Sequence, residues 1–459
     1  MAYRPLTASK IVIKDANSNT ANLSNTIFIS THAFTKNRVT SFVSMDEVNS
    51  LIPKETKAYT ALSGAFQQPV ISAPVYLGRR QADSMTITPN RVLSSAEYGF
   101  TLIVYDKSDY TEEQYDISVA SDTSAIATEI TNDLVAAMDD ISNVDVVNNT
   151  GSLTVSALAG YDFYVKDLST RLTATFETTE EAGEVFDAVL SEGNDNWYFV
   201  TADDHTNTFI KAMANTVEST ENSDYPKYYM YSVSDNSYLQ GVTDPATTVA
   251  GELNELGFDR TGGRWDQDDD KYPEVKKCVY IGGFDAGTIG WKGLPNMVGI
   301  PVASSPITGV DLDTASQGYI GDHNLSWWAK ELGVAFEHGG KSASGEWGDI
   351  IRGKDWIKSE QRKRLQDMWL NEATDGKLSY TPDDLKKPLN VIDSVNSDAV
   401  DREILEGFEP ASYARDITAA DKIERIIDSI NWTGYLAGAV YFMVTNGVLT
   451  YRDTDVTNL

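Results

Sequence analysis

The C-terminal segment, residues 418–459, constrains the fold most, because it carries strand-forming sequence that needs a partner. Residues 439–451 are rich in β-branched and aromatic side chains, and Asn446-Gly447 among them is a hairpin signal. A single hairpin is only marginally stable in water, and an open sheet edge pairs readily with other chains. Residues 10–14 also read as a strand. Two terminal strands that need neighbours predict strand exchange between subunits, as in a protein that assembles.

A helix is expected just before this strand sequence. Thr418 and Asp421 have the spacing of a capping box, which satisfies N–H groups at the start of a helix. The apolar residues that follow recur at helical spacing, at Ile423, Ile426, Ile427 and Ile430. We therefore expect a helix over residues 418–431.

The charge of the chain limits the partners that it can bind. The 459 residues suffice for roughly two to four domains, and the net charge is 37 − 68 = −31. The electrostatic field of this negative charge repels phosphate backbones and anionic lipids. We therefore expect no nucleic-acid partner and no binding to anionic membranes. The longest apolar run, residues 435–444, is too short to cross a bilayer, and the N-terminus has no signal-peptide core. We expect a protein kept in a cytoplasm-like environment, unless a larger particle carries it elsewhere.

Residues with catalytic or metal-binding chemistry are few. The single cysteine, Cys278, excludes an intramolecular disulfide and a cysteine metal cluster, and the four histidines lack metal-site spacing. Residues 339–342 resemble the end of a phosphate loop, but Ala335 stands where that loop needs glycine. Residues 266–270 resemble the start of a calcium loop, but Lys271 stands where that loop needs glycine. We expect no catalytic residue, no metal and no cofactor.

The composition and the pattern of the sequence change along the chain, and they predict a multidomain fold of α/β and α+β type. We expect residues 1–20 to form an arm that joins an assembly domain. Residues 21–84 and 181–334 would form the two parts of a discontinuous α/β middle domain, because strands alternate with helices there. Residues 85–180, rich in Ser, Thr, Asp and Val, would form an inserted α+β outer module. Residues 335–459 would complete the assembly domain and carry the terminal exchange strand.

Within these regions, local patterns predict particular elements. The expected strands cover residues 26–30, 74–78, 100–105, 114–119, 144–147, 153–157, 197–201, 227–231, 277–281 and 297–303. The expected helices cover residues 46–51, 59–67, 124–138, 205–217, 245–256 and 358–370. Cys278 would therefore lie on a buried strand.

One concentration of basic residues stands out in this acidic chain. It consists of Arg352, Lys354, Lys358, Arg362, Lys363 and Arg364. Either these residues lie on a solvated helix face with weak local ion pairs, or they bind an acidic surface of an identical neighbouring subunit. The sequence leaves both interpretations open.

Several stretches, taken together and in order, carry a family resemblance. They are residues 9–13, 26–30, 44–48, 74–79, 115–119, 124–138, 340–345 and 347–356. In this order they resemble the contractile tail sheath proteins of bacteriophages, although no single motif is specific. The strong acidity of the chain and its polar sequence after Tyr451 depart from many sheath proteins.

The resemblance implies a structural subunit rather than an enzyme. Sheath subunits form hexameric rings that stack helically around a tail tube, are joined by exchanged β-strands, and contract to drive the tube through the host envelope. The implied partners are further copies of the chain, the tail tube protein, and baseplate and tail terminator proteins. The protein would be assembled in the host cytoplasm and reside in the virion tail.

Specific residues are expected to make these contacts. The residues expected to carry the exchanged strands are Ile11, Val12, Ile13, Val440, Phe442 and Val444. The six basic residues would make ionic contacts between subunits, and Lys422 and Arg425 would face the tube. Two alternatives stay open: another tail, tube, capsid or baseplate component of a virion, and an enzyme on a flavodoxin-like sheet.

Overall fold

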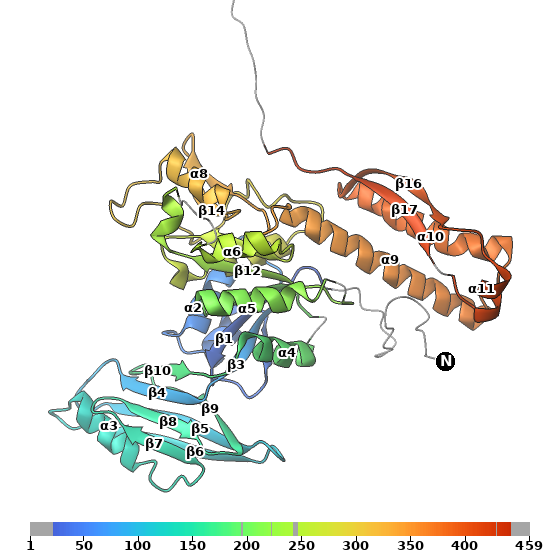
Figure 1. The fold of residues 1–459 in the computed structure, drawn as a ribbon. Coiled ribbons are helices and arrows are strands. Elements are labelled where there is room, and N and C mark those ends of the chain that lie inside the picture. The colour runs from blue at the N-terminus through green and yellow to red at the C-terminus, as the bar shows by residue number, and fades with distance from the viewer. Residues whose placement is uncertain (1–21, 194–195, 222, 242–246, 428, 442–459) are drawn as a thin grey trace, which may run out of the picture.

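The computed structural model describes residues 22–193, 196–221, 223–241, 247–427 and 429–441. Within them the chain is a mixed α/β protein of several domains with several separate sheets (Figure 1). The mixed α/β class expected from the sequence is thus confirmed. Across these ranges no helix combines the length and the apolar character that crossing a membrane requires.

A six-stranded sheet forms the body of the protein. Its strands are β1 (Thr26–His32), β2 (Val39–Phe42), β3 (Val75–Gln81), β11 (Phe199–Ala202), β12 (Tyr228–Val233) and β13 (Thr261–Trp265). They lie in the order β13-β12-β11-β1-β3-β2, and every neighbouring pair is parallel except β2 and β3. The largely parallel sheet that we expected from alternating strands and helices is confirmed.

Helices cover both faces of this sheet. They are α1 (Met45–Leu51), α2 (Lys57–Phe66), α4 (Ala182–Gly193), α5 (Asn207–Glu218), α6 (Val249–Leu256) and α7 (Pro273–Gly282). Successive side chains of a strand point to opposite faces. Phe28 therefore joins the apolar core with α2 and α7, whereas Ile27 and Ile29 join the core with α4, α5 and α6. Burying each of these side chains contributes about 2 kcal/mol to stability.

The prediction of a strand over residues 277–281 is wrong, because these residues belong to the helix α7. Cys278 is buried as expected, but in a helix. All ten residues of α7 are buried, including Lys276 and Lys277. A short segment buried on every side has no polar face, so its periodicity does not distinguish a helix from a strand.

The prediction of a strand over residues 297–303 is also wrong, because this segment lies outside any regular strand. It is held in place by isolated contacts, such as the hydrogen bond from Ala303 N–H to the Trp328 carbonyl (2.7 Å). The regular elements of this region are η1 (Asn236–Leu239), η3 (Asp269–Lys271), α8 (Thr314–Asp322), β14 (Trp327–Glu331) and β15 (Val334–His338).

The chain leaves the central sheet after β3 and returns to it at β11. The intervening elements are β4 (Ser84–Pro89), β5 (Glu97–Asp106), β6 (Glu112–Ala120), α3 (Ala127–Ala136), β7 (Val144–Asn148), β8 (Leu153–Ala157), β9 (Tyr161–Lys166) and β10 (Leu172–Glu177). They form two antiparallel sheets, β10-β4-β8-β7 and β6-β5-β9, beside which α3 packs. The predicted strand pairs and helix are confirmed, whereas β4, β9 and β10 were not predicted.

The C-terminal part forms a long arm that extends from the body (Figure 1). Its elements are α9 (Gly348–Asp375), α10 (Pro382–Asp401), β16 (Leu405–Tyr413), α11 (Ala419–Glu424) and β17 (Ile430–Leu436). The two helices lie side by side, and the β16–β17 pair packs along α10.

Candidate assembly interface

The arm is held together by the apolar side of α10. The Thr381 hydroxyl caps this helix by accepting the Asp384 N–H (3.3 Å), and Pro382 suits the first turn because it needs no N–H there. Val395 and Ala399 are fully buried and share a core with Leu405 of β16. The helix therefore covers one face of the β16–β17 pair.

The β16–β17 pair, which we call the ribbon, is a sheet of only two strands in the described part of the chain. Each strand therefore has one edge without a partner strand there. Trp432 packs toward the core, whereas Tyr435 and Leu436 are 50% and 47% exposed. A two-stranded ribbon with open edges is a template for another strand.

The helix that we predicted over residues 418–431 is much shorter. The capping box of Thr418 and Asp421 is present, but α11 ends at Glu424, and Arg425 adopts a left-handed conformation (φ 60°). The prediction that the helix continues to residue 431 is wrong, because Ile430 begins β17. Lys422 and Arg425 are both exposed, in α11 and at its C-cap. Figure 1 shows α11 at the end of the arm far from the body.

Most of the predicted basic residues bind within the chain. Lys358 donates to the Glu221 carbonyl (2.7 Å), and Arg362 pairs with Asp224, so both attach α9 to the body. Arg364 pairs with Asp398 and thus joins α9 to α10. Lys354 and Lys363 also lie on α9, where Lys354 is exposed and Lys363 is half-buried.

The prediction that Arg352 contacts a neighbouring subunit is wrong, because its side chain is 1% exposed. Its guanidinium donates to the carbonyls of Leu23 (2.9 Å), Ile281 (3.2 Å) and Phe284 (2.7 Å). Burial lowers the pKa of Arg352 to about 10. The residue is an internal link between α9 and the first described residues of the chain.

Most of the predicted exchange residues lie outside the described ranges: Ile11, Val12, Ile13, Phe442 and Val444. Val440 is described, is 80% exposed and lies outside any strand. The sequence did not indicate the strand β16, which has apolar, acidic and proline residues without a clean alternation.

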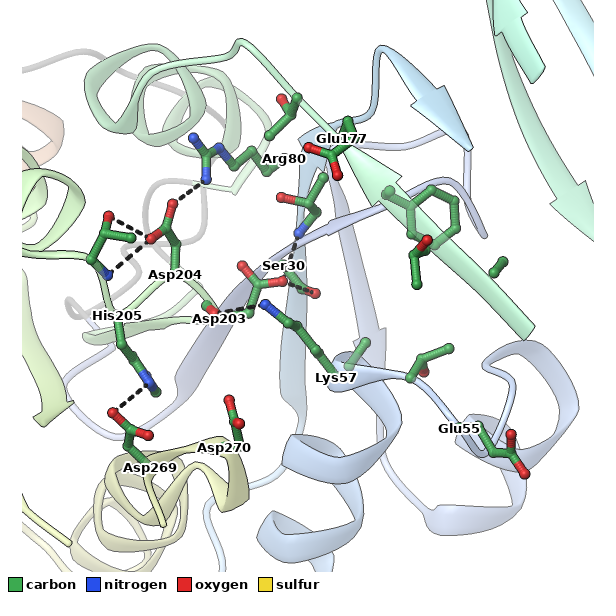
Figure 2. A pocket seen from close by; sticks show the side chains of 18 residues that line it. Ser30, Glu55, Lys57, Arg80, Glu177, Asp203, Asp204, His205, Asp269 and Asp270 are labelled. Atoms are coloured by element: carbon green, nitrogen blue, oxygen red, sulfur yellow. Dashed lines mark hydrogen bonds and ion pairs between the residues drawn. The ribbon is translucent and has the colours of Figure 1, made fainter. Parts of the chain in front are cut away.

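A cavity of about 630 Å³ lies at the carboxyl ends of β1, β3 and β11. In open parallel sheets, ligands bind at this edge where the strand order reverses direction. In the sheet, β3 lies on one side of β1 and β11 lies on the other, so the strand order reverses direction at β1. The cavity, whose lining side chains are drawn in Figure 2, lies at this point. This cavity is the observation that favours the enzyme alternative.

Several polar and charged groups that line this cavity bind neighbouring groups of the protein. The Ser30 hydroxyl donates to the Asp203 carboxylate (2.8 Å), Lys57 donates to the Asp203 carbonyl (3.3 Å), and Arg80 pairs with Asp204 (2.8 Å). Burial raises the pKa of Asp203. No motif marked these residues, because Ser30 and Asp203 are 173 positions apart and meet only in the folded sheet.

His205 belongs to the same group of charges. Its two ring nitrogens lie 3.6 Å from Asp269 and 3.5 Å from Glu274. Burial alone would lower the pKa of His205, but the interactions with Asp269 and Glu274 outweigh it and raise the pKa to about 10. A histidine that is permanently charged is a poor proton acceptor near neutral pH. Among the described residues, no three or more His, Cys, Asp or Glu side chains gather where a metal ion would fit.

Comparison with known proteins gives matches at the level of structure alone. No protein-family model and no curated protein sequence matches the chain. A chain of the anti-feeding prophage baseplate, solved by cryo-EM with 6-fold symmetry, is 10% identical with a TM-score of 0.53, and the match covers 98% of this chain and 100% of that one. A chain of the anti-feeding prophage helical sheath in its contracted state gives the same identity and TM-score, over 96% and 99% of the two chains. A sheath tail protein from Desulfitobacterium hafniense is 7% identical with a TM-score of 0.49, over 94% and 97%.

Such low identity shows the fold alone. The first two matches cover nearly the whole chain, so they include the body, the inserted elements and the arm. The resemblance inferred from the sequence is confirmed at this level: the chain has the fold of contractile sheath proteins.

Proposed function

We propose that the protein is a structural subunit of a contractile tail sheath, in which copies are joined by exchanged β-strands. The observation that carries the proposal is the ribbon: two strands on an extended arm, covered on one face and open at both edges within the described residues. The sequence supplies strand-forming segments near both of its ends, at residues 10–14 and 439–451. Strand acceptor and strand donors thus occur in one chain.

Strand addition suits a polymer that must move without coming apart. An added strand is held by main-chain hydrogen bonds along its length, while alternate side chains fill pockets and fix the register. On the donor side we assign this role to Ile11, Val12 and Ile13, and to Val440, Phe442 and Val444. The ribbon of a neighbouring copy would receive them.

Each region of the chain would have a separate structural role in the assembly. In this proposal the body is a discontinuous α/β domain built from residues 21–84 and 181–334, and residues 85–180 form an outer module inserted into it. Residues 335–459, together with the arm at residues 1–20, form the assembly domain. The central sheet supports this division, because β3 and β11 belong to one sheet although the whole insertion separates them.

The working cycle would be mechanical. Subunits would form hexameric rings stacked around a tail tube and bounded by baseplate and terminator proteins, and the extended polymer would shift to a denser packing when triggered. Such a bistable assembly draws its energy from interfaces and needs no nucleotide hydrolysis. Lys354, which is exposed, is a candidate for contacts between subunits, and the exposed Lys422 and Arg425 are candidates for contacts with the tube. The protein would be assembled in the host cytoplasm and carried in the virion tail.

The alternative of an enzyme rests on the cavity at the edge of the sheet. The mutual pairing of its charged groups argues against it, as does the similarity to sheath and baseplate chains. A thermal-shift screen with nucleotides and other small anions tests this alternative. A reproducible rise of several degrees with one ligand would favour a binding site.

Deleting residues 1–14 tests the proposal directly. We expect the truncated chain to fold and stay monomeric, because the body buries its own core and loses only the donor strand. Negative-stain micrographs and sedimentation would show tubes with a wide lumen for the full chain and none for the truncated chain.

A full-length variant controls for the loss of length. Ile11→Ser, Val12→Ser and Ile13→Ser together should abolish tubes, whereas Asn17→Ser with Asn19→Ser should leave them intact. Normal tubes from the truncated chain or from the triple variant would refute strand exchange. If the full chain forms only small discrete particles at every salt and protein concentration, the sheath proposal itself is wrong.

A further inference from the structure

Tyr441 is the last described residue of the chain, and its side chain is docked although the residues before it are exposed. Residues 437–440 are all exposed, and Val440 is 80% exposed. Tyr441, in contrast, lies partly buried with its ring 4.5 Å from the ring of Trp347. One aromatic side chain thus returns to the body at the end of an exposed segment.

The phenol group of Tyr441 makes several contacts at this place. Its hydroxyl donates to Asp349 (3.4 Å), and the Lys292 ammonium lies 5.9 Å from the centre of its ring. Burial and the nearby Asp349 carboxylate raise the pKa of Tyr441, which keeps the hydroxyl protonated as a donor. A partly buried phenol that packs against an indole ring and bonds to a carboxylate indicates a specific site rather than a chance contact.

Glycine makes room for this side chain. A Cβ atom at Gly290 would collide with the Tyr441 hydroxyl. The site, which we call the socket, therefore consists of Gly290, Trp291 and Lys292 on one side and Trp347 and Asp349 at the start of α9 on the other.

The other terminal segment is held one helical turn away. Arg352 lies three positions after Asp349 on α9. Its guanidinium donates hydrogen bonds to the Leu23 carbonyl (2.9 Å) and to the Ser24 hydroxyl (3.4 Å). Leu23 and Ser24 lie two and three positions after residue 21 in the sequence. The first two turns of α9 thus hold both points at which the chain passes into its terminal segments.

We propose that these two turns of α9 act as a hub that fixes where both terminal segments leave the body, with Tyr441 and Arg352 as its positioning residues. The inference rests on the proposed strand exchange and adds to it a defined starting point for each donor strand. Residues 442–459 span at most roughly 60 Å when extended. The 28 residues of α9 are about 42 Å long, so a donor that starts at its base can reach past the arm to another copy.

A fixed starting point matters because a loosely tethered strand samples many positions and registers. Holding its first residue lowers the entropy that docking costs, and directs each copy to the same neighbour. Loss of the socket should therefore change the regularity and yield of tubes more than the stability of the subunit.

Two substitutions, one in each partner of the contact, should remove the Tyr441 side chain from the socket. Tyr441→Ala removes the side chain, and Gly290→Ala expels it while leaving Tyr441 unchanged. In the dilute monomer, we expect hydrogen exchange at the Trp291 and Lys292 amides to become about tenfold faster in both variants, because the side chain that packs against this segment is lost. Under assembly conditions we expect a large loss of regular tubes. The double variant should be no worse than either single one, since both remove the same contact.

Two controls sharpen the test. Tyr441→Phe keeps the ring and loses only the hydrogen bond to Asp349, so it should leave exchange at the two amides nearly unchanged and retain most tubes. Gly318→Ala, a glycine with open space around it, should change neither readout.

Each other outcome has a distinct meaning. Unchanged exchange in Tyr441→Ala would show that the socket is not occupied in solution, and faster exchange with normal tubes would show that it positions nothing. Either result overturns the hub and leaves the sheath proposal intact. Failure of the unmodified chain to form tubes would overturn the sheath proposal, and the hub with it.

Discussion

Strands β1 and β17 are both seven residues long, yet their surroundings are opposite. β1 has a partner on each edge and helices on each face, and six of its seven residues are buried. In the described part of the chain, β17 has one partner, and none of its residues is buried. The body is therefore complete as a single chain, whereas the arm offers backbone groups and apolar surface that an added strand would cover. In the proposed sheath, this difference would separate the part of the molecule that folds by itself from the part that joins other copies.

The largest expected effect is in the body. Glu337 is fully buried with Arg264 (2.5 Å) and Lys277 (3.1 Å), so Glu337→Gln leaves two buried cations without their carboxylate. We expect the free energy of unfolding to fall by about 3–5 kcal/mol, measured by urea denaturation of the monomer. Glu409→Gln in the arm, where the exposed carboxylate accepts only the Tyr435 hydroxyl, should change it by less than about 0.5 kcal/mol. Equal changes in the free energy of unfolding at Glu337 and Glu409 would contradict the contrast between the body and the arm.

A pH dependence in the body comes next. His205 has its pKa raised to about 10 in the folded protein, above the unfolded value of 6.5. Its contribution is therefore complete below about pH 6.5 and is lost as the pH rises toward 10. We expect the free energy of unfolding to fall across this window by an amount on the order of a few kcal/mol. In His205→Gln this fall should be much smaller, and an unchanged pH profile would show that the histidine is not held as a cation.

A small effect on stability is also expected at the end of the arm. Lys422 and Arg425 are exposed, so Lys422→Glu with Arg425→Glu should shift the free energy of unfolding by less than about 1 kcal/mol. If these residues face a tail tube, the double variant should still form sheath tubes by itself but assemble poorly around the tube protein. Co-sedimentation with the tube protein measures this, and undiminished binding would remove both residues from the proposed interface.

Prediction from sequence succeeded where a local pattern is strong. The strand pair β5–β6, the helix α3 and the pair β7–β8 follow from alternation, helical spacing and turn residues, each within a short window. The helix α7 was mistaken for a strand because a segment buried on all sides loses its polar face. The ribbon was missed in part because β16 has no clean alternation and β17 overlaps a series of isoleucines at helical spacing.

The features of the candidate site likewise fall into those that the sequence predicts and those that only the tertiary structure decides. The sequence alone determined a basic helix in an acidic protein and a capped turn at Thr418, and it predicts terminal strands that lie mostly outside the described residues. Tertiary structure decided how those features are used: Arg352 is buried against carbonyls, and Tyr441 docks beside Trp347. The physical reason is distance along the chain. Helical spacing, alternation and caps act between neighbours in sequence, whereas the partner of a guanidinium or a phenol is chosen only when segments hundreds of residues apart are packed together.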